Sequence, residues 1–296
     1  MRVFVTGASG FIGSALIPEL LGHGHQVLGL ARSDAAASAL EAAGAQVQRG
    51  SLDDPRSLQD GARAADGVIH LAFKHDFSDF AGAVDTDQQA IAALGEALAS
   101  TGRPLVIASG ILGVAPDRTA TERDVPDPSI NLRARSAQQT LALEGRGVRP
   151  VVVRLSPTVH DLNDPGFVRT LVDVARRQGV SGYVADGQNR WPAVHRQDAA
   201  RLFRLALESA PAGSVLHAVA EEGVAAREIA ASIGRHLQLP VQSIASDDAA
   251  AHFGWIGRFF SVDAPASSAQ TRAALGWQPT HRGLMDDLEH GDYFRP

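Results

Sequence analysis

The chain begins with a strand-like run that ends in three glycines, and this beginning constrains the fold more than any other segment. Residues 2–13 read RVFVTGASGFIG, so Gly7, Gly10 and Gly13 are spaced G-x-x-G-x-x-G. Apolar residues then recur at helical spacing, which predicts a strand, a glycine turn and a helix. Such a turn allows the close approach of a dinucleotide pyrophosphate and close packing of helix on strand. The free N–H groups and positive dipole end at the helix start bind the anion. The alternative is an ordinary glycine-rich turn without a ligand.

The first half of the chain alternates strand-like and helix-like segments. The expected strands are Arg2–Thr6, Gln26–Ala31, Gln46–Arg49, Gly67–Leu71, Pro104–Ser109 and Pro150–Leu155. The expected helices are Phe11–His23, Asp34–Ala43, Pro55–Ala64, Phe80–Thr101 and Asn131–Gly147. Several strands are almost continuous apolar runs, which suit a parallel sheet covered on both faces. The pattern predicts an α/β fold with a Rossmann-type doubly wound parallel sheet, whose ligands bind beyond the carboxyl ends of the strands.

The pattern changes after Leu155, where a polar, proline-containing loop is expected over Ser156–Gly166. Further helices are expected at Gly166–Gly179, Arg196–Ser209, Ala226–Leu237 and Ser268–Leu275, with short strands at Val215–Val219 and Val241–Ile244. We therefore expect a dinucleotide-binding domain over residues 1–155 and a smaller mixed substrate-binding domain over residues 156–296. Some segments of the second domain are expected to return to the sheet.

Composition excludes several classes of function. The 296 residues are 45% hydrophobic and 20% charged, with a formal net charge of −6 and no basic stripe, so we expect a globular protein without a nucleic-acid partner. The absence of cysteine excludes disulfides and thiolate metal sites, and the eleven histidines show no metal-ligand spacing, so no metal is expected. No segment approaches the roughly 20 apolar residues of a membrane helix, and no secretory signal is visible. We expect a cytoplasmic monomer or homodimer that acts on a small molecule.

The end of the second expected strand should decide which dinucleotide binds. An acidic residue there favours NAD, because it accepts a hydrogen bond from the ribose 2′-hydroxyl. This chain has Arg32 and Ser33 instead, which can pair with a 2′-phosphate and predict NADP, with NAD the less favoured alternative. Asp34 opposes this prediction if its carboxylate turns inward.

The third expected strand is followed by Asp53. Its carboxylate can accept a hydrogen bond from the adenine amino group. Capping of the next helix is an equally plausible role for this residue.

The chain resembles the NAD-dependent epimerase/dehydratase group of extended and atypical short-chain dehydrogenases/reductases over about residues 1–200. The resemblance rests on TGASGFIG at 6–13, GSLD at 50–53, VIHLA at 68–72, ASG at 108–110, RLSPTVH at 154–160 and WPAVHRQDAA at 191–200. Together with the residues after the second strand, it implies a set of cofactor contacts: Gly7, Ser9, Gly10, Phe11, Ile12, Gly13, Arg32, Ser33, Leu52, Asp53, Leu71, Ala72, Phe73, Pro157, Thr158 and Val159.

The chain departs from the family at the catalytic Tyr-x-x-x-Lys, where Arg133 and Ala137 stand in place of the tyrosine and lysine. An alkoxide formed by hydride transfer must be protonated, so another donor is needed. The catalytic candidates are Ser109, His160, Lys74 and Arg133. By resemblance, Ser109 orients a carbonyl oxygen and His160 lies beside the nicotinamide, where an imidazole can donate a proton near neutral pH. Lys74 follows the fourth strand, and Arg133 can stabilise negative charge.

Three functions agree with these features. The first is an NADP-dependent oxidoreductase that transfers hydride to or from a small carbonyl or alcohol substrate without Tyr-x-x-x-Lys. The second is a non-catalytic NAD(P)-binding sensor or regulator that keeps the fold and the cofactor. The third is a nucleotide-sugar epimerase or dehydratase, which normally needs the same tyrosine and lysine.

Overall fold

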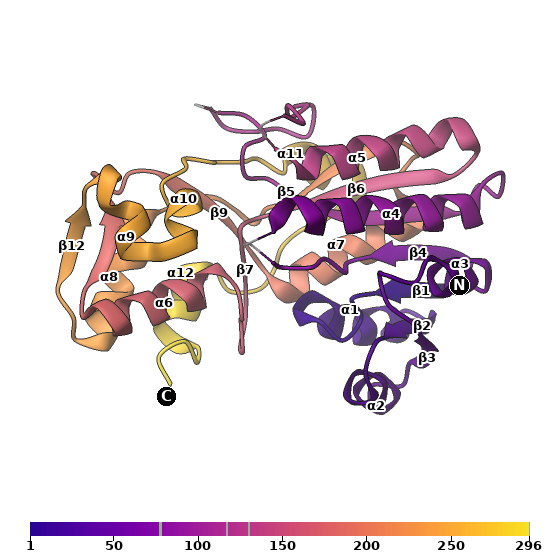
Figure 1. Ribbon diagram of the computed structural model, residues 1–296, viewed down its shortest axis with the longest axis horizontal. Coiled ribbons are helices and arrows are strands. Elements are labelled where there is room, and N and C mark those ends of the chain that lie inside the picture. Colours follow the sequence, from indigo (N-terminus) through magenta and orange to yellow (C-terminus); the bar gives the residue numbers. More distant parts are fainter. Residues whose placement is uncertain (77–78, 117, 130, 296) are drawn as a thin grey trace.

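A seven-stranded parallel sheet forms the centre of the fold (Figure 1). The computed structural model describes residues 1–76, 79–116, 118–129 and 131–295. The strands lie in the spatial order β10-β6-β5-β4-β1-β2-β3. Their bounds are β1 Arg2–Thr6, β2 Gln26–Ala31, β3 Gln46–Arg49, β4 Gly67–His70, β5 Pro104–Gly110, β6 Arg149–Leu155 and β10 Ser214–Ala218.

Helices cover both faces of this sheet, as Figure 1 shows. One face carries α1 (Phe11–Gly22), α2 (Asp34–Ala42) and α7 (Arg196–Ser209), and the other carries α3 (Pro55–Arg63), α4 (Phe80–Leu98) and α5 (Arg133–Ala142). Side chains alternate between the two faces along each strand. In β1, Val3 and Val5 therefore join the core under the first set of helices, while Phe4 joins the core under the second. The structure confirms the doubly wound parallel sheet that the sequence predicts.

The second, smaller lobe contains two short sheets, ordered β11-β9-β7 and β12-β8. Its strands are β7 Thr158–His160, β8 Ser181–Val184, β9 Arg190–His195, β11 Glu221–Ala225 and β12 Val241–Ile244. Its helices are α6 Phe167–Gln178, α8 Ala226–Leu237, α9 Ala249–Phe253, α10 Gly257–Phe260 and α12 Leu284–His290, with 3₁₀ turns η2 Ser246–Asp248 and η3 Gly254–Ile256. This lobe has its own buried core, which includes Trp191, Phe253 and Tyr293.

Three segments that follow Leu155 in sequence pack with the main sheet. Strand β10 pairs with β6 at the sheet edge, α7 packs on α1, and α11 (Ala269–Leu275) contacts both α7 and β10. Just after α11, the fully buried Trp277 donates its indole N–H to the carbonyl oxygen of Asp198. The sheet lobe is therefore built from both halves of the chain.

The structure corrects some expected bounds. Helix α5 begins at Arg133 and passes into the 3₁₀ turn η1 (Leu143–Arg146), so it is shorter than the expected Asn131–Gly147. The expected loop Ser156–Gly166 contains β7, which pairs with β9. No helix within the described ranges is long and apolar enough to cross a membrane.

Candidate cofactor and substrate site

The glycine turn between β1 and α1 packs closely against the neighbouring backbone, which is possible only because its glycines lack side chains. Gly7 has φ +68°, and a Cβ there would lie 2.7 Å from the backbone nitrogen of Ala72. A Cβ on Gly13 would lie 2.1 Å from the carbonyl oxygen of Gly7. Gly10 is the N-cap of α1, and no side chain caps the helix. The start of α1 thus keeps its backbone donors for an anion, so these residues fit a dinucleotide pyrophosphate.

The segments assigned to the cofactor lie along one edge of the main sheet. After β3 the chain crosses back to place β4 on the other side of β1, and ligands of doubly wound folds bind at such a switch point. The backbone of Leu71 and Ala72, after β4, lies against Gly7, and the Leu71 N–H donates to the carbonyl oxygen of Thr6 at 3.2 Å. The segments with Arg32 and Leu52 follow β2 and β3 at the same edge. Phe11 lies beneath Arg196, whose Cζ is 4.6 Å from the ring centroid.

Arg32, Ser33 and Asp34 stand at the carboxyl end of β2. Arg32 is exposed, and its side chain makes no hydrogen bond or ion pair with the described part of the chain. Ser33 is the N-cap of α2, and its hydroxyl oxygen accepts a hydrogen bond from Ala36 N at 3.2 Å. Asp34 forms an ion pair with Arg49. The Asp34 carboxylate is therefore engaged at the surface, which leaves the Arg32 guanidinium available at this corner, as far as the described residues show.

Asp53 and Lys74 bind each other. Lys74 Nζ donates to Asp53 Oδ1 at 2.6 Å, and both side chains are partly exposed. Helix α3 is capped by Asp54, whose carboxylate accepts from the N–H groups of Arg56 and Ser57. The alternative role of Asp53 as a helix cap is thus filled by its neighbour. Lys74 ties the segment after β4 to the segment after β3.

A series of buried polar groups leads from β1 through β4 and α4 to α5. Thr6 Oγ1 lies 2.7 Å from His70 Nδ1, and His70 Nε2 lies 3.1 Å from Asp87 Oδ1 on α4. Asp87 Oδ2 lies 4.0 Å from Arg133 Nη1. Burial acts to raise the pKa of Asp87, but the hydrogen bond from His70 and the charge of Arg133 outweigh it and hold the pKa below its ordinary value. Asp87 is therefore a buried, ionised carboxylate.

Arg133 lies over the carboxyl ends of β4 and β5. Its Nη2 donates to the carbonyl oxygen of Ala108 at 2.6 Å, and its Cζ lies 3.9 Å from the centroid of the Phe73 ring. Burial lowers the pKa of Arg133, while Asp87 opposes this shift. Next to Ala108, the hydroxyl of Ser109 has no hydrogen-bond partner within the described ranges and is not sealed from solvent. The two catalytic candidates Arg133 and Ser109 thus lie together at the end of β5.

In strand β7, the side chain of His160 points to the face opposite Pro157 and Val159, the residues expected to contact the cofactor. In β7 and the residue before it, Pro157 and Val159 are half-buried, while Thr158 and His160 are fully buried, as expected from strand alternation. His160 Nδ1 lies 2.7 Å from Asp287 Oδ2, and its Nε2 is buried without a partner in the described residues. His160 therefore presents no nitrogen at the surface, in contrast to the proton-donor role expected from the sequence. The Thr158 hydroxyl is likewise engaged, since it donates to the carbonyl oxygen of Pro192.

Comparisons with known proteins agree with this geometry. The family model described as the NAD dependent epimerase/dehydratase family matches residues 3–219. The chain belongs to this family. An uncharacterized protein of Schizosaccharomyces pombe is 48% identical over 296 residues, which are 99% of this chain and 100% of the relative. A 4-hydroxy-2-methyl-3-oxo-4-farnesyl-3,4-dihydroquinoline-1-oxide ketoreductase of Stigmatella aurantiaca is 28% identical, covering 73% of this chain and 67% of its own length. The solved structure of MoeE5 in complex with UDP-glucose and NAD has the same fold, with a TM-score of 0.79, 23% identity and coverage of 100% and 99% of the two chains.

His70 and Asp87, the two buried polar residues between Thr6 and Arg133, are not among the residues that the sequence pattern points to. Each nevertheless carries a local signal. His70 ends the apolar strand β4, and Asp87 lies among the buried positions of α4, between Val84 and Ala90. A carboxylate on a helix face that is otherwise apolar needs a buried partner. No group of three or more histidine, aspartate or glutamate side chains in the described part of the chain is arranged to hold a metal ion.

Proposed function

We propose that the protein is an NADP-dependent oxidoreductase that transfers hydride between its cofactor and a small carbonyl or alcohol substrate. The observation that carries this proposal is the position of Ser109 and Arg133. They lie at the end of β5, two strands from the glycine turn, on the sheet edge where the family binds its dinucleotide. When bound, the dinucleotide supplies hydride chemistry. The ketoreductase among the relatives supports carbonyl reduction as the reaction.

NADP is preferred over NAD in this proposal because of Arg32. A guanidinium without a protein partner can pair with a 2′-phosphate at no cost to the fold. Ser33 keeps its hydroxyl hydrogen as a donor even while its oxygen caps α2. Asp34 does not compete for the ribose, because it is paired with Arg49.

Ser109 and Arg133 take the roles that the tyrosine and lysine have in the family and that this chain lacks. The Ser109 hydroxyl donates to the carbonyl oxygen of the substrate and orients it. Arg133 stabilises negative charge as it develops on that oxygen, because its guanidinium stays protonated. The proton that completes the alcohol comes from water.

The test is a cofactor titration followed by a substrate panel. The purified protein is titrated with NADPH and NADH, and NADPH oxidation is then followed with aldehydes and ketones, each with and without a carboxylate. We expect tighter binding of NADPH and turnover of at least one carbonyl compound. Failure of both NADPH binding and turnover contradicts the proposal.

The sensor or regulator is the second candidate, because Arg133 and Ala137 replace the pair on which family catalysis depends. Tight NADPH binding with no turnover across the panel would favour it. A nucleotide-sugar reaction would instead appear as conversion of UDP-glucose with NAD. We expect none, because that chemistry uses the same tyrosine and lysine.

A further inference from the structure

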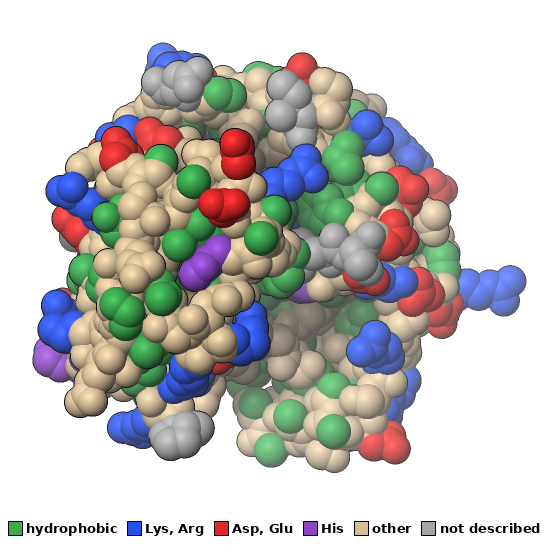
Figure 2. Space-filling view, turned by 60° about the vertical axis from the view of Figure 1, so that its left-hand side comes forward, with side chains coloured by type: hydrophobic (Ala, Val, Ile, Leu, Met, Phe, Trp, Pro, Cys, Tyr) green, Lys and Arg blue, Asp and Glu red, His purple; other side chains and the backbone are tan. Residues whose placement is uncertain are grey.

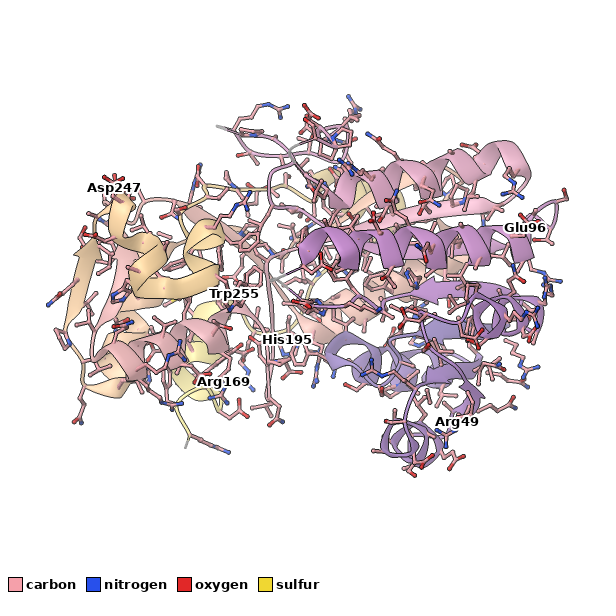
Figure 3. The ribbon with its side chains drawn as sticks, in the orientation of Figure 1. Arg49, Glu96, Arg169, His195, Asp247 and Trp255 are labelled. Carbon is pink, nitrogen blue, oxygen red and sulfur yellow. The ribbon has the colours of Figure 1, made fainter. Side chains whose placement is uncertain are left out.

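Arg196 lies where the two lobes meet and contacts the start of α1. It is the first residue of α7, directly after β9, and its Cζ lies 4.6 Å from the centroid of the Phe11 ring. Phe11 is the first residue of α1 and directly follows the N-cap Gly10. Figure 3 shows His195, the residue before Arg196, between the two lobes. The Arg196 guanidinium therefore lies beside the glycine turn of the sheet lobe.

The same guanidinium binds the loop that follows β7 in the smaller lobe. Arg196 Nε and Nη2 lie 3.1 Å and 2.8 Å from Asp161 Oδ2. The other oxygen of Asp161, Oδ1, accepts the backbone N–H of Leu162 at 2.7 Å and lies 3.4 Å from His195 Nε2. The side chains of Arg196 and Asp161 are 19% and 14% exposed, so salt screens this ion pair less than one at the open surface.

The position of the Phe11 ring depends on this guanidinium. Phe11 is half-buried, and its ring belongs to none of the hydrophobic cores of the described residues. Its neighbour Ile12, by contrast, packs against the core under α1. A cation over an aromatic face is attracted to it, and this attraction is the support that the Phe11 ring has. The contact with Arg196 therefore orients the first side chain of α1.

Phe11 and Asp161 adjoin two different parts of the expected cofactor site. Phe11 belongs to the turn that fits a pyrophosphate, and Asp161 follows closely after the segment 157–159, which is expected beside the nicotinamide. Figure 2 shows the surface hollowed between the two lobes. A dinucleotide bound in this way contacts both lobes, so its affinity depends on their separation. The apparent affinity falls in proportion to the fraction of the protein that has the binding arrangement.

We propose that Arg196 is a positioning residue for the dinucleotide. Together with Phe11 and Asp161 it forms an interlobe clasp that holds the pyrophosphate and nicotinamide parts of the site at a fixed separation. This inference rests on the dinucleotide site of the proposed function and adds the residue that holds the two parts of the site together. The clasp acts on the part of the cofactor that spans the lobes, whereas Arg32 is proposed to act on the 2′-phosphate. The two arginines should therefore affect different ligands.

The test compares ligands that do and do not reach the smaller lobe. NADPH, NADH and adenosine 2′,5′-bisphosphate are titrated by calorimetry, and the bisphosphate has the adenine end and the 2′-phosphate without the nicotinamide end. Arg196→Met should weaken NADPH and NADH alike by about fivefold or more, since about fivefold is the upper range for an exposed ion pair. It should leave the affinity for the bisphosphate unchanged. Arg196→Lys should recover part of the loss, because it keeps the charge beside Asp161 without the planar group over Phe11.

Asp161→Asn is a second variant, which removes the charge of the partner and keeps the size of its side chain. It should weaken NADPH and NADH in the same way, and the double variant should bind no more weakly than either single variant, because both break one ion pair. Arg201→Met is the matched control and should bind all three ligands like the wild type. Arg201 lies on the same helix, and its Nη1 donates to the carbonyl oxygen of Gln278 at 3.3 Å.

Wild-type affinity for NADPH and NADH in both Arg196→Met and Asp161→Asn overturns the inference. An equal loss for all three ligands also overturns it, because the damage would then include the adenine end, and so does a loss for NADPH alone, which would assign Arg196 to the 2′-phosphate. The expected pattern of affinities with no turnover of any carbonyl compound supports the clasp and refutes the reductase function. Turnover by a protein whose cofactor affinities do not depend on Arg196 does the reverse. No binding of either dinucleotide to the wild type overturns both.

Discussion

Gly10 and Gly13, two of the three glycines at the β1–α1 turn, are expected to respond differently to an added side chain, and Gly22 at the end of α1 is the control for Gly13. A Cβ at Gly13 would lie 2.1 Å from the carbonyl oxygen of Gly7 and 2.6 Å from that of Ala8, so backbone must move. Overpacking of this kind costs about 1–3 kcal/mol. In a chain of this size that lowers the unfolding temperature by about 2 °C per kcal/mol. Gly22, in the last turn of the same helix, has nothing within 4 Å of its Cβ position. Gly22→Ala should therefore stabilise the protein, by up to about 1 kcal/mol from helix propensity.

A substitution at Gly10 is expected to change cofactor binding without changing stability. Its Cβ would meet only the carbonyl oxygen of Gly7, at 3.1 Å, and its φ of −78° suits any residue. Gly10→Val should therefore unfold within a few degrees of the wild type. Its branched side chain would fill the space above the start of α1, so NADPH binding should be lost at every concentration titrated.

The assay combines thermal unfolding with fluorescence titration of NADPH for the wild type and the three variants at Gly10, Gly13 and Gly22. Wild-type affinity in Gly10→Val would show that the turn does not bind the pyrophosphate. A Gly13→Ala protein as stable as Gly22→Ala would refute the packing argument, because the two variants gain the same helix propensity.

Arg32→Ala should weaken NADPH binding by about 10- to 150-fold, the range of one charged hydrogen bond, and leave NADH binding unchanged. Arg63→Ala, at the far end of α3, is the control, and equal wild-type affinities for the two cofactors contradict the prediction. Ser109→Ala should lower kcat by about 100-fold or more without changing the affinity for NADPH, since an oriented donor to the carbonyl oxygen is lost; an unchanged kcat excludes Ser109 from the reaction. Burial lowers the pKa of His217 from 6.5 to about 4, so the unfolded chain gains its proton first as the pH falls. The free energy of unfolding should then drop between about pH 7 and pH 4 by up to about 3 kcal/mol, measured by urea denaturation. The same pH slope in His217→Gln would show that this residue is not the cause.

The main sheet could be predicted closely because its signals are local. The bounds of β1, β2 and β3 equal the expected ones, since each is a short run bounded by glycine or polar residues. In the smaller lobe the pattern predicts β12 with its exact bounds, but it does not predict β7, β8, β9 or β11. Strand β7 has three residues and β11 contains Gly223, and each is held by pairing with β9 rather than by its own propensity. Such strands depend on partners distant in sequence, which a local pattern does not contain.

The candidate cofactor and substrate site shows the same difference between local signals and contacts of distant segments. The glycine turn lies within one strand and one helix, so its spacing alone predicts it. The position of His160 depends on the register of β7, whose alternation turns this residue toward Asp287. The bond between Asp53 and Lys74 joins loops after two strands that are not neighbours in the sheet. These contacts follow from how loops of different strands meet.

The buried charges beside Arg133 bear on whether this site has lost its chemistry. A buried charge costs several kcal/mol unless it is paired. Yet the Asp87 side chain is only 2% exposed. Its Oδ1 lies 3.1 Å from His70 Nε2, and its Oδ2 lies 4.0 Å from Arg133 Nη1. Replacing such a group of charges with apolar residues is often neutral or stabilising, so stability alone does not account for it. An oriented cation at the end of β5 is what these charges provide, and this is the property that a carbonyl reductase needs and a passive dinucleotide sensor does not.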